Sequence, residues 1–241
     1  MAFRIRRIIP VLALLISVGR VAADDGRTPF TVVLDPGHGG TDAGVRRDPL
    51  TEKGLTLDIA RRVETILKGR PEIRVLLTRT DDTRVSSDDR KKLGNANPAG
   101  IYISLHFASA SDPALRGPRV YVLPPPTVSG TRSALPKADQ AHAWSLSESW
   151  KLAKTLSRTL APQEADGLAR IAPLPLVPLL GVTVPCTLVE IDYLTAADSS
   201  RWSDPVSVEA TAQQIASAIT LYQQPVPSLD PAPPAGNNPP P

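Results

Sequence analysis

The chain has few groups that could cross-link it, because Cys186 is the only cysteine among its 241 residues. A single thiol excludes an intrachain disulfide, so a hydrophobic core must hold the fold together. Cys186 begins the apolar run CTLVE, which is typical of a buried strand. We therefore predict a small core residue at this position rather than a nucleophile.

A long apolar run is also lacking. The apolar stretch at residues 8–19 is shorter than the roughly 20 residues that a membrane-spanning helix needs. Three arginines precede it at positions 4–7, and the small residues Val21-Ala22-Ala23 follow it. Residues 1–23 are therefore predicted to be a signal peptide, cleaved before Asp24, with an uncleaved anchor as the alternative. The mature protein is expected in the periplasm or outside the cell at the wall, with no stable membrane insertion.

Basic runs are missing from the rest of the chain. Of the 27 lysines and arginines, four lie within residues 1–23, so 23 basic residues face 24 acidic residues after cleavage. A chain this close to neutral has no electrostatic footprint for nucleic acid, and we predict no nucleic-acid partner.

The C-terminal segment lacks the apolar side chains that a packed module requires. Residues 224–241 contain eight prolines, and we predict a disordered tail there. The remaining residues, 28–223, have the length of one domain and show no internal repeat.

Short apolar runs alternate with segments of helical period along this domain. Strands are predicted at residues 30–34, 75–78, 101–107, 120–123 and 187–194, and helices at residues 55–66, 86–95, 152–160 and 205–219. Ser86 and Asp89 form a capping-box pattern, and Asp204-Pro205 is a typical helix start. The alternation predicts a single α/β domain with a twisted, largely parallel or mixed sheet flanked by helices.

Three ionisable side chains are predicted at the carboxyl ends of strands, where ligands bind in open α/β sheets. His38 follows the first strand within DPGHGG, His106 ends IYISLH, and Glu190 lies in TLVEIDYL. Each alone is typical of a hydrogen-bonded structural residue. Because the chain has only three histidines, their combination favours a zinc site of two histidines and one carboxylate, although no HExxH helix fixes its geometry.

Several motifs in their order resemble a known family. They are VVLDPGHGGTDAG, TEKGLTLDIARRVETIL, VLLTRTDD, DDRKKLGNANPAGIYISLH and PCTLVEIDYL, and they extend through nearly all of residues 31–221. This ordered set resembles the zinc-dependent N-acetylmuramoyl-L-alanine amidases, bacterial enzymes that remodel peptidoglycan.

The resemblance implies a role for four residues. His38, Glu52 and His106 would bind one Zn²⁺ ion, and Glu190 would be the catalytic carboxylate. Glu52 has this role only through the resemblance, because an acid before a helix otherwise indicates a solvated first-turn residue favoured by the helix dipole. The substrate would be peptidoglycan, cut between N-acetylmuramic acid and the L-alanine of the stem peptide.

The chain departs from the family pattern at two places. Ala108 stands where a polar residue is usual, and Asp192-Tyr193 replaces a common Gly-Phe pair. Strand alternation predicts that Asp192 shares the face of Glu190, where a second acid would raise a carboxylate pKa.

Two other functions and one regulatory feature stay open. The chain could be a non-catalytic peptidoglycan-binding or regulatory protein on the same scaffold, or a zinc peptidase of the stem peptide. Residues 124–150 contain His142 and Glu148, and we expect a surface loop with a short helix. Some family members carry an insertion near this place that blocks zinc until an activator protein moves it.

Overall fold

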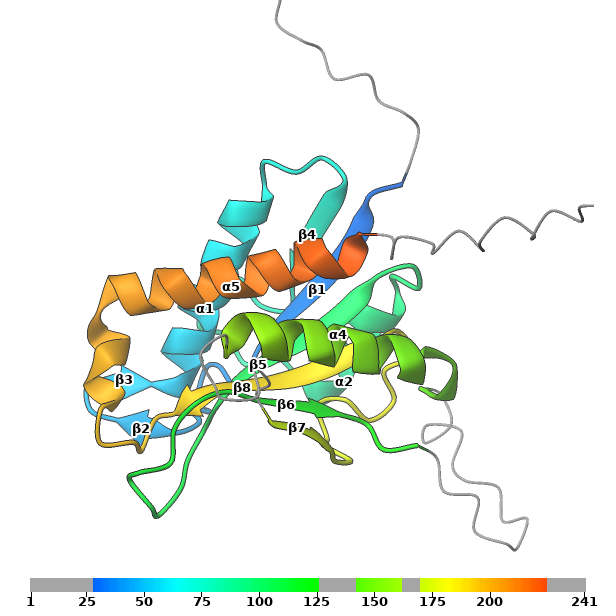
Figure 1. The fold of residues 1–241 in the computed structure, drawn as a ribbon. Helices are drawn as coiled ribbons and strands as arrows, with labels where there is room; N and C mark the ends of the chain where they lie inside the picture. Colours follow the sequence, from blue (N-terminus) through cyan, green and yellow to red (C-terminus); the bar gives the residue numbers. More distant parts are fainter. Residues whose placement is uncertain (1–27, 126–141, 162–169, 225–241) are drawn as a thin grey trace, which may run out of the picture.

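A six-stranded sheet forms the centre of the fold, in the order β4-β1-β5-β8-β6-β7 (Figure 1). The computed structural model describes residues 28–125, 142–161 and 170–224. The strands are β1 (Phe30–Pro36), β4 (Ile73–Leu77), β5 (Ile101–Ala108), β6 (Arg119–Val122), β7 (Arg170–Pro173) and β8 (Cys186–Tyr193). All five predicted strands are present, with ends shifted by one or two residues.

The sheet is mixed. Strands β4, β1, β5 and β8 run parallel, β6 is antiparallel to β8, and β7 is parallel to β6. This arrangement confirms the predicted α/β class. A separate antiparallel pair, β2 (Arg46–Arg47) with β3 (Leu50–Thr51), precedes the first helix. Neither this pair nor β7 was predicted, because segments of two to four residues show no period in the sequence.

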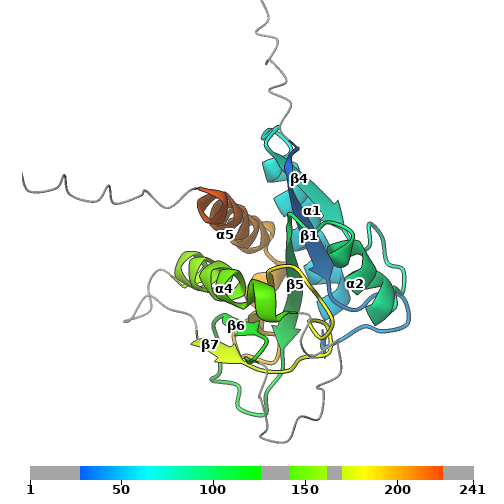
Figure 2. The same ribbon diagram turned by 90° about the vertical axis from the view of Figure 1, so that its right-hand side faces the viewer.

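Helices cover both faces of the sheet. They are α1 (Glu52–Leu67), α2 (Ser87–Asn95), α4 (Leu146–Leu160) and α5 (Pro205–Gln223), with 3-10 helices η1 (Ala143–Ser145) and η2 (Ser199–Ser203). Helices α1, α4 and α5 contribute to the core on one face, and α2 lies on the opposite face (Figure 2).

Both predicted helix starts have the expected caps. The Ser86 hydroxyl accepts a hydrogen bond from the backbone N–H of Asp89 at 3.1 Å, and an Asp204 carboxylate oxygen accepts one from Val206 at 2.9 Å. These bonds satisfy backbone donors that the first helical turn leaves unpaired, which explains why α2 and α5 begin at these residues.

Alternating side chains of the strands divide the core into two layers. Val32 and Ile103 pack under α1, α4 and α5, whereas Val33, Tyr102 and Cys186 pack on the other face. Cys186 is 1% exposed, as expected for a core residue, and burial raises the pKa of its thiol to about 12. The thiol therefore stays protonated at neutral pH.

Some predicted segments lie outside the described residues: the signal peptide at 1–23, the tail beyond Gln224, and residues 126–141 of the loop before α4. Helix α4 begins at Leu146, earlier than predicted. In the described part of the chain, no helix is both long and apolar enough to cross a membrane.

Candidate metal centre and catalytic carboxylate

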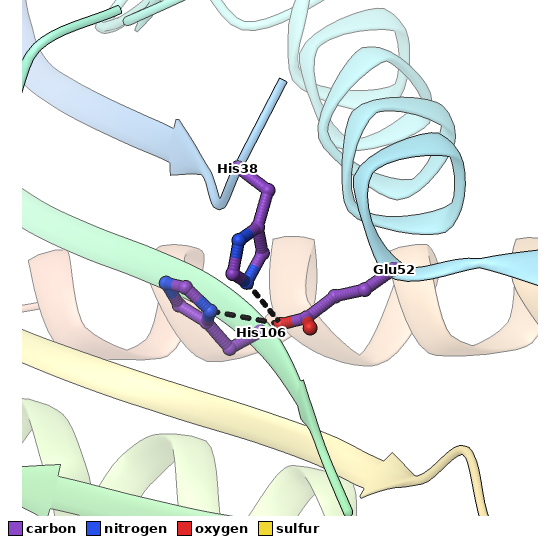
Figure 3. Close-up of side chains that lie close together, drawn as sticks. All are labelled: His38, Glu52 and His106. Atoms are coloured by element: carbon purple, nitrogen blue, oxygen red, sulfur yellow. Dashed lines mark hydrogen bonds and ion pairs between the residues drawn. The ribbon is translucent and has the colours of Figure 1, made fainter. Parts of the chain in front are cut away.

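Three of the predicted site residues meet at the carboxyl ends of β1 and β5 (Figure 3). His38 lies in the loop after β1, His106 lies in β5, and Glu52 is the first residue of α1. Glu52 Oε1 lies 3.0 Å from His38 Nε2 and 2.9 Å from His106 Nδ1. One nitrogen from each histidine and one carboxylate oxygen are all within 4.8 Å of one another.

The loop after β1 directs His38 through unusual backbone angles. His38 has a φ of 61°, and Gly39 and Gly40 follow with 127° and 61°. A left-handed backbone conformation is disfavoured for residues with a side chain. Glycine at positions 39 and 40 avoids this cost, so His38 is the one residue of the three that bears it. Gly37 is required for a second reason, because a side chain there would collide with the His106 ring. The sequence DPGHGG thus packs two imidazoles together, with ring centroids 4.9 Å apart.

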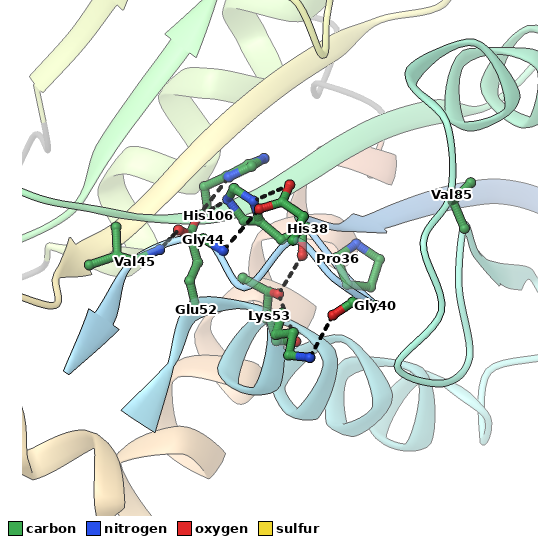
Figure 4. A network of polar contacts seen from close by, with 12 residues as sticks. Pro36, His38, Gly40, Gly44, Val45, Glu52, Lys53, Val85 and His106 are labelled. Carbon is green, nitrogen blue, oxygen red and sulfur yellow. Dashed lines mark hydrogen bonds and ion pairs between the residues drawn. The ribbon is translucent and has the colours of Figure 1, made fainter. Parts of the chain in front are cut away.

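Glu52 is held in place by backbone donors. Its Oε1 accepts a hydrogen bond from the N–H of Phe107 at 2.9 Å. Its Oε2 accepts one from the N–H of Val45 at 2.8 Å (Figure 4). The residue is 2% exposed. The position before the helix is therefore a buried one, whereas local sequence pattern alone indicates a solvated acid.

The charges of the cluster are strongly coupled. Burial alone would raise the pKa of Glu52, but the hydrogen-bonding contacts with His106 and His38 outweigh burial and keep the pKa far below its usual range. Contact with Glu52 in turn raises the pKa of His38 against the effect of burial. Without a metal ion, Glu52 is thus a carboxylate at every ordinary pH and His38 retains a proton more readily than a free histidine does.

Asp42 orients His38 and was not predicted from the sequence. Its Oδ2 lies 2.9 Å from His38 Nδ1, and its Oδ1 accepts a hydrogen bond from the N–H of Gly44 at 3.1 Å. A carboxylate on Nδ1 fixes the imidazole and leaves Nε2 for a metal, as is usual for metal-binding histidines. Asp42 lies only four residues after His38, and that short spacing is the signal that could have identified it.

The donor set fits zinc. Two imidazole nitrogens and one carboxylate oxygen match catalytic zinc sites, which have three protein ligands and one open position. Bonds of about 2.0–2.2 Å place the ligand atoms of a tetrahedral site about 3.3 Å apart. The separations of 3.0 and 2.9 Å from Glu52 Oε1 to the two histidines lie close to that spacing.

Glu190 lies on the strand next to His106 but outside this cluster. It is directly opposite His106 across the β5–β8 pair and opposite Arg119 across the β6–β8 pair. The Tyr121 hydroxyl donates a hydrogen bond to Glu190 Oε2 at 2.9 Å. Tyr121 was not singled out from the sequence, since its contact with Glu190 depends on the antiparallel register of β6.

The predicted placement of Asp192 beside Glu190 is wrong. The β5–β8 register shifts between His106 and Ala108, and this irregularity breaks the alternation of β8. Asp192 instead accepts hydrogen bonds from Trp202 Nε1 at 2.9 Å and Arg201 Nη2 at 2.6 Å. It is a buried, paired structural acid beside Trp202, which packs in the core layer covered by α1, α4 and α5.

An open cleft of about 640 Å³ lies beside the three candidate metal ligands. His38 and His106 line it together with Arg84, Ser86 and the apolar residues 177–178. The lining residues are therefore mainly polar, with a few apolar side chains, which is usual for a site that fixes the orientation of a ligand through polar groups.

Comparison with known proteins agrees with this geometry. Residues 32–221 match the family of N-acetylmuramoyl-L-alanine amidases. The chain belongs to this family. Among its family relatives, the amidase LytC of Bacillus subtilis is 28% identical over 196 residues, covering 80% of this chain and 35% of LytC. The probable amidase AmiB of Haemophilus influenzae is 38% identical over 97 residues, covering 39% of this chain and 22% of AmiB.

Solved structures of the amidase family share the fold. The catalytic domain of CwlV from Bacillus (Paenibacillus) polymyxa var. colistinus superposes with a TM-score of 0.65 at 30% identity, covering 80% of this chain and 97% of that domain. The CwlD amidase of Clostridioides difficile, solved in complex with the GerS lipoprotein, has a TM-score of 0.63 at 19% identity, covering 80% and 98%, and shows likeness of fold alone. The matched parts of the first curated relatives are about a fifth to a third of their own lengths. The resemblance predicted from the sequence motifs is confirmed at the level of the family.

Proposed function

We propose that this chain is a zinc-dependent peptidoglycan hydrolase that cleaves the amide between N-acetylmuramic acid and the L-alanine of the stem peptide. The observation that carries the proposal is the His38, Glu52 and His106 cluster, whose ligand atoms lie within 4.8 Å of one another. Membership of the amidase family indicates which amide bond would be cleaved. The open cleft beside the two histidines would allow a polymeric substrate to reach the site.

His38, Glu52 and His106 would hold the zinc ion. Bound zinc supplies Lewis-acid chemistry: it lowers the pKa of water to about 7 and polarises the carbonyl under attack. Asp42 keeps His38 in the required orientation through its contact with Nδ1, and the backbone N–H groups of Phe107 and Val45 fix the Glu52 carboxylate.

Glu190 carries the proton in this proposal. It takes a proton from the attacking water and delivers it to the departing nitrogen, so the lactyl carbonyl becomes a carboxylate and L-alanine leaves with a free amino group. The hydrogen bond from Tyr121 to Oε2 fixes the side chain and leaves Oε1 to exchange the proton. Glu190 is next to His106 across the sheet, where adjacent strands are about 4.8 Å apart.

An enzyme that acts on peptidoglycan must be exported from the cytoplasm. Residues 1–23, the predicted signal peptide, would deliver the enzyme to the periplasm or the outer wall, where peptidoglycan lies. Sequencing the amino terminus of protein recovered from cells tests this step: a mature chain that begins near Asp24 supports it, and an intact Met1 overturns it.

Digestion of purified peptidoglycan followed by mass spectrometry tests the reaction. Amidase action releases stem peptides with a free L-alanine amino terminus and leaves glycan chains without peptide. Cuts inside the stem peptide would instead identify a zinc peptidase, and intact peptidoglycan bound to the protein would identify a non-catalytic binding protein. Protein stripped of metal, with and without added zinc, and the Glu190→Gln variant serve as controls.

Residues 127–141 bear on possible regulation by an activator protein. The complex of CwlD with a lipoprotein motivates the question for this chain. Deletion of residues 127–141 should raise turnover without any partner if the segment blocks the site. Unchanged turnover would remove self-inhibition from the proposal.

A further inference from the structure

Two buried arginines contact the loop that carries His38, and neither is one of the three candidate metal ligands. Arg79 follows β4 and is 3% exposed, and Arg90 belongs to α2 and is 9% exposed. Their guanidinium groups point at the carbonyl oxygens of the three consecutive residues Pro36, Gly37 and His38. We call this pair the arginine clamp.

The hydrogen bonds of the clamp follow the loop residue by residue. Arg79 donates from Nε to the Pro36 carbonyl at 2.9 Å and from Nη2 to the Gly37 carbonyl at 2.8 Å. Arg90 donates from Nη1 to the Pro36 carbonyl at 2.7 Å and from Nη2 to the His38 carbonyl at 2.6 Å. Each guanidinium thus bridges two carbonyls, which a lysine with one nitrogen at the end of a flexible chain would not reproduce.

Rigid elements hold the two arginines themselves. Arg79 Nη2 also donates to the Lys53 carbonyl at 2.8 Å, next to Glu52 at the start of α1. Arg90 Nη1 lies 2.6 Å from Asp35 Oδ1 at the end of β1. The clamp therefore ties the His38 loop to α1 and to β1.

Stability alone does not account for this arrangement. Among the described residues, Asp35 is within salt-bridge distance of Arg90, but no carboxylate is that close to Arg79, whose guanidinium donates to neutral carbonyl oxygens instead. Burial lowers the pKa of Arg79, which reflects the cost of keeping that charge away from water. Buried charges of this kind are often less stabilising than apolar packing, and a role in the site explains their presence better.

The backbone of the loop shows what the clamp holds. His38 has a left-handed φ of 61°, which a residue with a side chain adopts only when its surroundings impose it. The Arg90 bond to the His38 carbonyl constrains the peptide on one side of this residue, and the Arg79 bond to Gly37 constrains the other. Relaxation of the φ angle would turn the imidazole away from Glu52 and His106.

We infer that Arg79 and Arg90 are positioning residues for the metal centre, which hold His38 in its metal-binding orientation through the backbone carbonyls of residues 36–38. The inference rests on the zinc site of the proposed function and adds two residues that do not touch the metal. Loss of indirect supports of this kind typically weakens metal affinity by about 10–100-fold.

Zinc affinity of the whole chain, measured against a competing chelator, tests the clamp. Arg79→Lys and Arg90→Lys keep the charge but remove the forked donor, and each should weaken zinc binding by about 10–100-fold. Arg62→Lys is the matched control. Arg62 lies on α1 and bonds with Asp58 and Glu209 at 2.9 and 2.8 Å, so its loss should leave zinc affinity unchanged.

Thermal unfolding of the metal-free variants separates affinity from folding. Weaker zinc binding by a variant that unfolds at the temperature of the wild type supports the clamp. A lower unfolding temperature with unchanged zinc affinity overturns it, because the arginines would then be structural only. Absorption of the cobalt-substituted protein adds a readout of ligand geometry, and an unchanged spectrum in both lysine variants also argues against the inference.

Thr56→Val gives a milder test if a lysine variant does not fold. The Thr56 hydroxyl donates to the Gly37 carbonyl at 3.1 Å and accepts from Arg79 Nη2 at 3.2 Å, so its removal loosens the same loop. Zinc affinity should fall by a smaller factor in this variant, and an unchanged affinity refutes the clamp. A wild-type protein that takes up no zinc would instead refute the proposed metal site itself.

Discussion

Replacement of Glu52 by glutamine should damage the protein in a way that the same change at Glu190 does not. Both Glu52 oxygens accept hydrogen bonds from backbone N–H groups, one from Phe107 and one from Val45. A glutamine side chain has only one oxygen, so its NH₂ group must face one of these N–H donors. Glu190 accepts from the Tyr121 hydroxyl, and the glutamine oxygen can keep that bond.

The magnitude follows from the unsatisfied donor. A buried N–H group without an acceptor costs about 1–3 kcal/mol. In a domain of this size, each kcal/mol lowers the unfolding temperature by about 2–4 °C, so metal-free Glu52→Gln should unfold about 2–12 °C below the wild type. Zinc occupancy should fall as well, because the amide is a poorer ligand for a cation than a carboxylate.

Glu190→Gln should behave differently in both measurements. It should retain about one zinc ion per chain, unfold near the wild-type temperature, and lose roughly 10²–10⁴ of the rate, the usual contribution of general acid–base catalysis. Elemental analysis, thermal unfolding in chelator and peptidoglycan hydrolysis measure the three quantities. A Glu52→Gln protein with full zinc and wild-type stability, or a Glu190→Gln protein that lacks zinc or hydrolyses at the original rate, would refute the reasoning.

Three further predictions concern other parts of the chain. Burial would raise the pKa of Asp35, but the charge of Arg90 holds that pKa below its usual range. The Asp35 carboxylate therefore stabilises the fold above about pH 4, and this stabilisation is lost as the pH falls through the pKa of the folded state. Denaturation at several pH values should therefore show Asp35→Asn to be about 3–5 kcal/mol less stable at pH 7, with a difference that narrows below about pH 4. Tyr121→Phe should keep its zinc and lower kcat by about tenfold or more through loss of the bond to Glu190, with KM little changed, and an unaltered kcat in steady-state kinetics would contradict that role. Truncation after Gln224 should leave the unfolding temperature and hydrolysis of soluble muropeptide nearly unchanged, whereas a large drop in that temperature would show that the tail docks on the domain.

Local sequence signals were sufficient for most of the fold. The strands and long helices have strong periods, and the caps at Ser86 and Asp204 depend on side chains within three residues of the helix start. The position of His38 after a strand was predictable for the same reason. Short elements such as β7 have no such period and are formed by pairing with a distant strand.

The remaining parts of the site depend on contacts that sequence spacing does not encode. Glu52 is buried because the backbones of Phe107 and Val45 meet over it, so only the family resemblance identified its importance. Asp192 points away from Glu190 because an irregularity in β8 interrupts the alternation. A single extra residue in a strand moves the following side chains to the other face of the sheet, and the local sequence pattern does not predict such an irregularity.

The strand order also separates, along the chain, the candidate metal ligands from the proposed base. His38, Glu52 and His106 come from the first half of the chain, whereas Glu190 arrives on β8, which occupies the middle of the sheet between β5 and β6. Strand β6 pairs with β8 rather than with β5, so the later strands join the earlier ones only through the strand that bears the proposed base. During synthesis, the groups that would hold the metal are therefore made well before the group that would move the proton. In the proposed amidase, proton transfer would therefore depend on insertion of β8, the last central strand to be made.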